Sequence, residues 1–361
     1  MSNPSVPTTS YPYRPDYAVP PGETLRDRLA EMNLSQAELA ARTGLSTKHI
    51  NQIVQGIAPL TPDTAIALER VTGVPAHIWN RRESDYRDSL IRQHRRTLDT
   101  EDRKWLASLP IKELQRRGRL PMNVDQTRLF DEVLAFFGVA NRDAWSTVWR
   151  RPIASFRRST AYRSDPGAVI AWLRIAQLDS HHIAAAPYSA IAFRKTLRQV
   201  RALTRRGDIN EMVTICAEAG VVVVFVPEVA GCRISGATWW AGPTRAIIAL
   251  SDRWKKDDRF WFSFFHEAAH VLLHSKKETY VDDGSEDDLL EREADRFAAA
   301  HLISPTDARL LPTLNTKPDV IDFAERIGVS PGIVVGRLQH DGLWPWNRGN
   351  DLKNGLRIIE G

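Results

Sequence analysis

Residues 260–274 read FWFSFFHEAAHVLLH. This stretch is almost wholly apolar, contains no glycine or proline and is too long for an ordinary strand, so it predicts a buried helix. Three ionisable side chains lie within the apolar run: His266, Glu267 and His270. Because residues four apart lie on one face of a helix, both imidazoles can reach one metal ion, with Glu267 beside it. A zinc ion would give these buried polar groups the partner that an apolar core lacks.

A second helical pattern, residues 291–300, favours the metal over the alternative, which is a pair of hydrogen-bonded core histidines. A catalytic zinc takes three protein ligands and leaves a fourth position for water. Glu291 and Asp295 share a helix face, so Glu291 can bind the metal while Asp295 accepts a hydrogen bond from the far nitrogen of a ligand histidine. Glu293 points away from that face and is either a solvated charge or a second-choice ligand.

The segments HEAAH (266–270), EREADRFA (291–298) and LISP (302–305) together resemble the ImmA/IrrE family of zinc metallopeptidases. The resemblance implies a zincin-like domain with a gluzincin arrangement and zinc-dependent endopeptidase activity. It assigns the Zn²⁺ ligands to His266, His270 and Glu291, and the general base to Glu267. The metzincin pattern is absent, because this chain has Leu273 and Lys276 where that pattern requires Gly and His.

A peptidase of this kind also needs a hydrogen-bond donor for the oxyanion of the transition state. The candidates, in order of preference, are Tyr280, His274 and His301. His274 follows His266 by eight residues, so its direction has drifted by about 80° around the helix and it is a poor fourth ligand.

Residues 21–82 predict a run of short helices. Ser35 and Glu38 form a capping box for a helix over 36–43, and Gly44 ends that helix. Ser46 caps a further helix that carries apolar residues at helical spacing. Two helices joined by a glycine-containing turn are typical of a helix-turn-helix.

The segment SQAELAARTGLSTKHI (35–50) resembles the XRE-type helix-turn-helix, and the flanking segments 21–25 and 74–79 are closest to HigA-type antitoxin regulators. The resemblance implies binding to a double-stranded DNA operator, with the third helix in the major groove, and a homodimer on two half-sites. The DNA-binding residues it implies are Gln36, Ser46, Thr47, Lys48, Asn51 and Gln52. A module that mediates only protein contacts is the alternative, because the third helix carries one lysine rather than a basic stripe.

The remaining pattern predicts a mainly α fold with a small β-sheet (α+β). Apolar residues recur at helical spacing over 106–119, 127–137 and 168–184, whereas 221–226, 234–240 and 246–250 predict strands. We expect Gly236–Trp240 to form an edge strand that holds a substrate peptide. The expected parts are a flexible tail (1–17), a helix-turn-helix domain (18–82), a helical linker or hub (83–207), a zincin-like peptidase domain (208–310) and a C-terminal helical appendage (311–361).

The composition fits this organisation. The 361 residues carry a net charge of +5, which permits nucleic-acid binding without requiring it. Cys216 and Cys232 suit reduced thiols in a cytosolic protein. No signal peptide or long apolar run is present in the sequence, so we expect a cytoplasmic protein with no membrane contact.

Two functions are consistent with these observations. The first is a DNA-binding transcriptional regulator whose zinc endopeptidase cleaves a partner repressor or toxin–antitoxin component, or its own chain, in a stress or phage-type response. The second is a non-proteolytic regulator or antitoxin whose zinc domain is a structural or effector-sensing module. The retained Glu267 favours the first, because a purely structural zinc site has no use for a general base.

Overall fold

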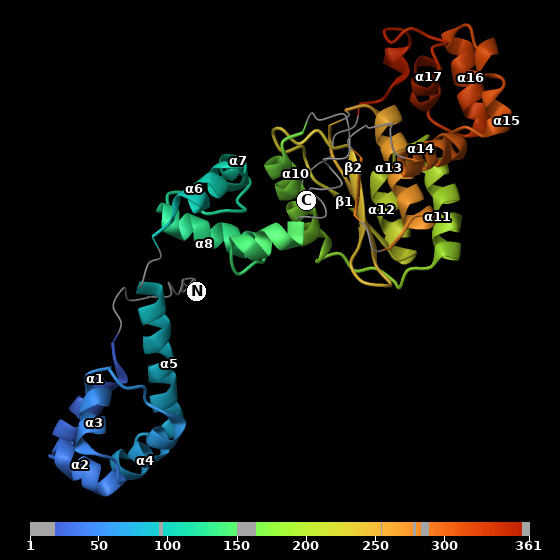
Figure 1. Cartoon of the computed structure of the whole chain (residues 1–361). Helices are drawn as coiled ribbons and strands as arrows, with labels where there is room; N and C mark the ends of the chain where they lie inside the picture. Colours follow the sequence, from blue (N-terminus) through green and yellow to red (C-terminus); the bar gives the residue numbers. More distant parts are fainter. Residues whose placement is uncertain are drawn as a thin grey trace, which may run out of the picture. The chain divides into compact units, whose positions relative to one another are not determined.

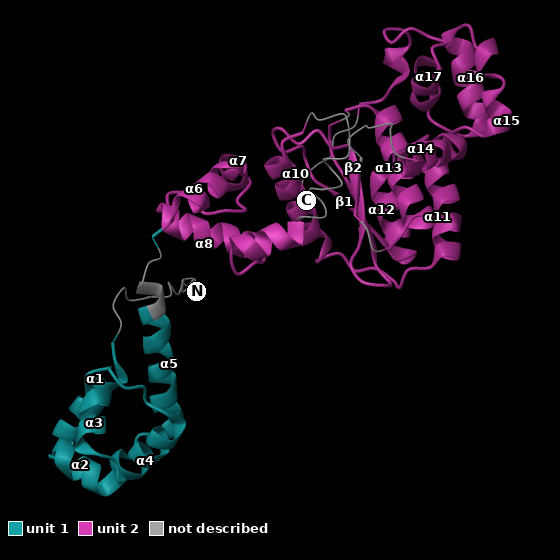
Figure 2. Ribbon diagram, in the orientation of Figure 1, with its two compact units in different colours: residues 1–97 teal, residues 98–361 magenta. Residues whose placement is uncertain are grey.

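The computed structural model describes residues 19–93, 97–149, 164–253, 255–276, 279–282 and 289–355. The chain divides into two compact units, residues 1–97 and residues 98–361 (Figure 2). The fold is mainly α with one four-stranded sheet, as the sequence predicts. The tail expected at 1–17 lies outside the described residues. The finer domain boundaries expected after residues 82, 207 and 310 stay predictions.

The described residues of the first unit form five helices around one apolar core. Its helices are α1 (Pro21–Glu31), α2 (Gln36–Thr43), α3 (Thr47–Val54), α4 (Pro62–Thr72) and α5 (Ala76–Gln93). The predicted capping box is present: the Ser35 hydroxyl accepts from the Glu38 N–H, and the Glu38 carboxylate accepts from the Ser35 N–H. Gly44 ends α2 at φ 75°, a left-handed conformation in which a side chain would be strained.

The second unit contains the sheet and the remaining helices. Its first helices are α6 (Thr100–Ala107), α7 (Ile111–Arg116), α8 (Gln126–Phe137), α10 (Pro166–Ser180), α11 (Ala190–Leu203) and α12 (Ile209–Glu218). The strands are β1 (Val221–Phe225), β2 (Gly236–Trp240), β3 (Ala246–Leu250) and β4 (Tyr280–Asp282). The later helices are α13 (Asp257–Leu273), α14 (Leu289–Leu302), α15 (Pro305–Ala308), η1 (Leu311–Thr313), α16 (Lys317–Ile327), α17 (Pro331–His340) and η2 (Asn350–Leu352). The single helix expected over 106–119 is split in two, because Pro110 lacks the N–H that a continuous helix needs there.

The sheet is mixed and buried on both faces. Its strand order is β1-β3-β2-β4, with β1 parallel to β3 and the other neighbours antiparallel. Successive side chains of a strand point to opposite faces, so Val221 and Val223 join one core while Val222 and Val224 join the other. Helix α10 lies against one face, and α12 and α13 against the other (Figure 1). This burial explains why β1 reads as a continuous apolar run.

The expectation that Gly236–Trp240 forms an edge strand is wrong. Gly236, Ala237 and Thr238 pair with β4, whose Tyr280 lies opposite Thr238. Strand β2 therefore lies between β3 and β4. A strand of only three residues leaves no periodicity in the sequence, so β4 gave no signal.

The C-terminal helices are anchored on the first turn of α13 through two buried carboxylates. Asp257 accepts hydrogen bonds from the Ser330 hydroxyl at 2.6 Å and from the Asn354 N–H at 3.0 Å. Asp258 forms a buried ion pair with Lys353 at 2.6 Å. Burial raises the pKa of Asp257, and the neighbouring Asp258 raises it further. These contacts join the segment 330–354 to the helix that carries His266 and His270.

Replacing Lys353 with methionine is expected to destabilise the protein by about 3–5 kcal/mol, because it leaves the Asp258 carboxylate buried without its cation. Urea unfolding of the full chain measures the change. The control is Lys317→Met, which breaks an exposed pair with Asp351 and should cost below about 1 kcal/mol. Equal decreases in the free energy of unfolding of the two variants would show that the buried pair of Asp258 and Lys353 contributes no more than the exposed pair.

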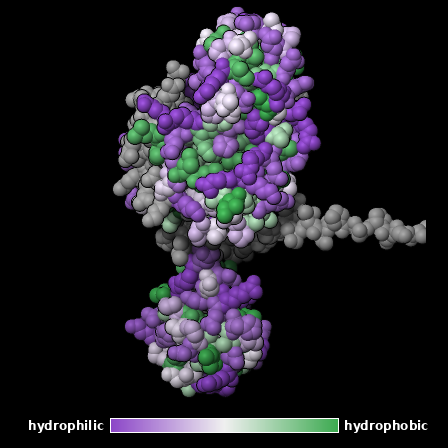
Figure 3. Space-filling model, turned by 90° about the vertical axis from the view of Figure 1, so that its right-hand side faces the viewer, coloured by the Kyte–Doolittle hydropathy of each residue, from purple (hydrophilic) through white to green (hydrophobic). Residues whose placement is uncertain are grey.

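Large apolar side chains are mainly enclosed in the three cores. Hydrophobic residues reach the surface in separate small groups on the face shown in Figure 3. The exposed large ones include Ile57, Ile191 and Leu289. Among the described residues, no helix is both long and apolar enough to span a membrane.

Candidate metal centre

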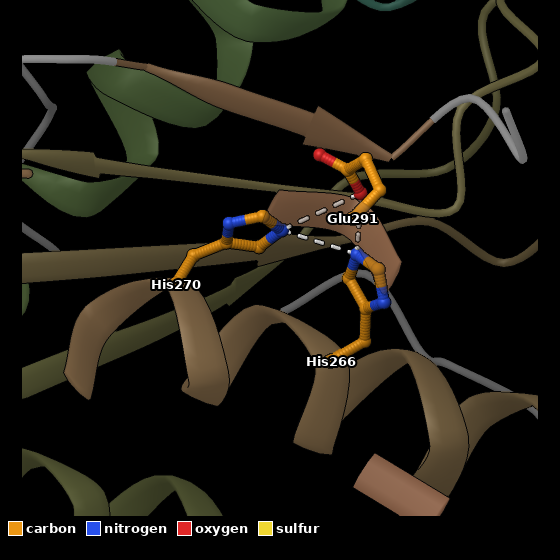
Figure 4. Close-up of side chains that lie close together, drawn as sticks. All are labelled: His266, His270 and Glu291. Carbon is orange, nitrogen blue, oxygen red and sulfur yellow. Dashed lines mark hydrogen bonds and ion pairs between the residues drawn. The ribbon is translucent and has the colours of Figure 1, made fainter. Parts of the chain in front are cut away.

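Two neighbouring helices bring His266, His270 and Glu291 together. The histidines lie one turn apart on α13, and their rings point toward Glu291 (Figure 4). Glu291 lies in the first turn of α14, which packs against α13. The His266 Nε2 atom lies 2.9 Å from the Glu291 Oε2 atom and 3.1 Å from the His270 Nε2 atom. The third side of this triangle, from His270 Nε2 to Glu291 Oε2, is 3.5 Å.

The triangle has the size and chemistry of a metal site. Tetrahedral zinc with bonds of about 2.0–2.2 Å separates neighbouring ligand atoms by roughly 3.3 Å. The three donor atoms lie within 4.8 Å of one another, and both imidazoles are buried. Two imidazole nitrogens and one carboxylate oxygen form a set that suits zinc and leaves a position open.

The electrostatics keep Glu291 ionised. Burial alone would raise the pKa of Glu291, but in the metal-free protein the adjacent His266 and His270 rings outweigh burial and lower it to about 2. Burial also lowers the pKa of His270, although the nearby Glu291 opposes that shift. A charged carboxylate beside a neutral imidazole is the protonation state that metal binding requires.

Each histidine of the triangle also has a partner on its outer nitrogen. The His266 Nδ1 atom lies 2.8 Å from the Asp295 Oδ1 atom, the arrangement expected from the sequence. The His270 Nδ1 atom lies 2.7 Å from the Nδ1 atom of His274. Glu293, the second-choice ligand, contacts His274 and not the triangle.

Glu267 directly follows His266 on α13, is fully buried and is held by strand β2. Its Oε2 atom accepts a hydrogen bond of 2.6 Å from the Thr238 hydroxyl. The backbone of Gly236 lies against the same carboxyl group, so a Cβ atom there would come within 2.6 Å of Oε1. Thr238 and Gly236 were not identified from the sequence, because nothing local to a strand 29 residues earlier marks it as the neighbour of Glu267.

Of the candidate oxyanion donors Tyr280 and His301, the structure brings only Tyr280 to the three donor atoms. Tyr280 stacks on His270 with ring centroids 4.5 Å apart, and its hydroxyl accepts from the Ser275 N–H. His301 follows Glu291 by ten residues on α14, which places it about 15 Å along the helix axis. It stacks on Phe297 at 4.0 Å instead. Tyr280 therefore stays a candidate, and His301 is not brought to the site.

The residues expected to contact DNA lie on α2 and α3 of the first unit. Thr47, Lys48 and Asn51 are exposed on α3, whereas Gln52 and Gln36 are partly buried. The Ser46 hydroxyl caps α3 by accepting from the His49 N–H at 3.1 Å. The apolar side of α3, formed by Ile50, Ile53 and Val54, faces the core. Helix α3 thus presents one polar face to solvent.

Two families match the chain in separate regions. Residues 216–339 match the IrrE N-terminal-like domain of the M78 peptidases, and residues 25–79 match the helix-turn-helix family. The chain is 34% identical over 83 residues to virulence-associated protein I of Dichelobacter nodosus, a match that covers 23% of this chain and 77% of that protein.

Two solved structures are similar to a part of the chain. One is the Pseudomonas aeruginosa antitoxin HigA with the higBA promoter, at 33% identity, 21% coverage of this chain, 83% coverage of that chain and a TM-score of 0.20. The other structure, also from Pseudomonas aeruginosa, is of a protein in complex with its operator DNA, at 33% identity, 21% and 82% coverage, and a TM-score of 0.20.

Proposed function

Because the chain belongs to the XRE-type helix-turn-helix family in its first unit and carries an IrrE-like peptidase domain in its second, we propose that it is a DNA-binding transcriptional regulator with a zinc-dependent endopeptidase. The substrate we propose is a partner repressor or toxin–antitoxin component, or the chain itself. The observation that carries the endopeptidase is that Glu267 is buried and directly follows His266 on α13, and that His266 supplies one corner of a triangle of three candidate metal-binding atoms.

Each residue of the site has a separate role in the proposed peptide hydrolysis. His266, His270 and Glu291 would hold the zinc ion, which, when bound, activates water and polarises a carbonyl group. Glu267 accepts a proton from the attacking water and passes it to the leaving amine. The Thr238 hydroxyl, at 2.6 Å, fixes the direction of the Glu267 carboxylate. Tyr280, stacked on His270, is the proposed donor to the oxyanion.

Metal content and new protein N-termini test this proposal together. We expect about one zinc per chain in the purified protein by native mass spectrometry. Adding the zinc-loaded protein to an extract of the cells that produce it should create new N-termini on a small set of proteins. Zinc binding without any cleavage would contradict the endopeptidase and support a non-proteolytic regulator instead.

The second candidate, a non-proteolytic regulator with a structural or effector-sensing zinc domain, is favoured by β4. Peptides commonly bind proteases and other domains by pairing with an exposed strand edge. In this protein β4 already pairs with Gly236–Thr238, beside Glu267. A substrate strand would therefore have to pair with β4 or replace it.

DNA binding through the exposed face of α3 is the second half of the proposal, with Thr47, Lys48, Asn51 and Gln52 reading the groove and Gln36 and Ser46 contacting phosphates. The helix-turn-helix family match carries this part. Proteins of this kind bind two half-sites as symmetric dimers, and we propose a homodimer here for the same reason.

Lys48→Ala is expected to weaken binding to the preferred operator by about 1–3 kcal/mol, because an exposed lysine at the start of α3 is placed to reach a base edge. The operator is first selected from random duplexes with the wild-type protein, and affinity is then compared at one fixed salt concentration. Arg70→Ala removes the same charge from an exposed position on α4 and should bind as the wild type does. Equal effects of the two changes would exclude α3 as the reading helix.

A further inference from the structure

We propose that His274 and Glu293 form a positioning pair that orients the metal ligand His270. The inference rests on the proposed metal centre and is independent of whether the protein cleaves peptides. It adds to the centre a series of hydrogen-bonded side chains, from the half-exposed Glu293 through His274 to the proposed ligand His270.

The contacts run in one line from Glu293 to the metal-binding atoms. The Glu293 Oε2 atom lies 3.3 Å from the His274 Nε2 atom. On the other side of its ring, the His274 Nδ1 atom lies 2.7 Å from the His270 Nδ1 atom. The His274 side chain is 2% exposed, whereas that of Glu293 is 50% exposed. A buried imidazole thus links a half-exposed carboxylate to a buried ligand.

The positions of the protons follow from the role of His270. Its Nε2 atom faces Glu291 and His266, so it must be unprotonated to bind a metal. A neutral imidazole then carries its proton on Nδ1, and this group donates to the His274 Nδ1 atom. His274 accepts there and carries its own proton on Nε2, which donates to Glu293. With this assignment of protons, each of the two contacts, His270 to His274 and His274 to Glu293, has one hydrogen-bond donor and one acceptor.

Helix geometry explains why His270 needs an intermediary. Asp295 lies one turn after Glu291 on α14 and reaches His266 directly. Glu293 follows Glu291 by two residues, which turns it by about 200° around the helix. His274 is the residue that ends α13, and it fills the space between Glu293 and His270. The His270 ring is therefore contacted in its plane by His274 and on its face by Tyr280, which stacks on it.

A simpler role for His274 is to end helix α13. Its backbone N–H donates to the His270 carbonyl group at 3.3 Å, and this contact does not depend on the side chain. Side-chain substitutions therefore separate the two roles. His274→Phe removes both ring contacts, whereas His274→Asn places an amide oxygen near the Nδ1 position and keeps an acceptor for His270.

The experiment measures zinc affinity of the full chain by competition with a chromophoric chelator, and the visible absorption of bound Co²⁺. We expect His274→Phe to bind zinc about 10- to 100-fold more weakly than the wild type and to change the Co²⁺ spectrum. His274→Asn should recover most of the loss. Glu293→Gln, which keeps an acceptor but removes the charge, should show a smaller loss. The matched control is His301→Phe, which replaces a histidine of α14 that stacks on Phe297, away from the triangle.

The outcomes distinguish this inference from the proposal on which it rests. A wild-type protein that binds no zinc overturns the metal centre and the pair with it. A wild type that binds zinc, with His274→Phe equal to His301→Phe in affinity and spectrum, overturns the pair alone. If His274→Phe fails to fold, as judged by circular dichroism of the zinc-free protein, Glu293→Gln decides: unchanged affinity and spectrum overturn the pair, and a weaker affinity supports it.

Discussion

Replacing Glu291 with alanine is expected to reduce zinc from about one ion per chain to a trace after dialysis. The variant keeps two imidazoles but loses the one anionic donor of the triangle, whose pKa of about 2 keeps it charged at any physiological pH. The loss of affinity should exceed the roughly 10- to 100-fold that follows removal of an outer partner. Elemental analysis by inductively coupled plasma mass spectrometry measures it.

A graded set of variants makes the result specific to the triangle. Asp295→Ala removes only the outer partner of His266, so its zinc content should lie between those of Glu291→Ala and the wild type. Glu325→Ala changes an exposed acid on α16 and should bind zinc as the wild type does. Full zinc content in Glu291→Ala would show that the third ligand lies elsewhere.

Glu267→Gln is expected to keep zinc and to lose cleavage by about 10²- to 10⁴-fold. The amide has nearly the shape of the carboxylate, and its oxygen still accepts from the Thr238 hydroxyl, but it cannot take a proton from water. Single-turnover rates on a substrate identified from new N-termini give the size of the loss.

Thr238→Ser is the matched control for Glu267→Gln, because it keeps the hydroxyl that donates to Glu267. Its rate should stay near that of the wild type. Cleavage by Glu267→Gln at the wild-type rate would remove Glu267 from the proposed mechanism, and loss of zinc in that variant would make Glu267 part of the metal site instead.

Local sequence signals predicted the parts of the fold that depend on neighbouring residues. The Ser35–Glu38 capping box and Gly44 bound α2 as expected, because caps act within one helical turn. The spacing of His266 and His270 predicted a shared face, and both Nε2 atoms do meet Glu291. The role of these residues as zinc ligands stays a prediction.

Contacts between distant segments were beyond what spacing could show. Nothing in residues 236–240 indicates that Thr238 would hold Glu267, since the contact forms only when β2 packs on α13. His274 was expected to be a candidate oxyanion donor and a poor fourth ligand, because the 3.6-residue period turns it away from His266. The structure places it behind His270, where it contacts the outer nitrogen.

The anchor at the start of α13 has a consequence for the order in which the protein folds during synthesis. Asp257 precedes its partner Asn354 by 97 residues, and Lys353 is nearly as distant in sequence from Asp258, whose charge it neutralises. Domains fold largely as units while the chain emerges from the ribosome. Residues 266–291, which supply the proposed metal-binding atoms, are made before Ser330, Lys353 and Asn354, the partners of these two carboxylates. The helix that carries the proposed ligands therefore lacks two of the contacts at its first turn until residues 353 and 354 have been made.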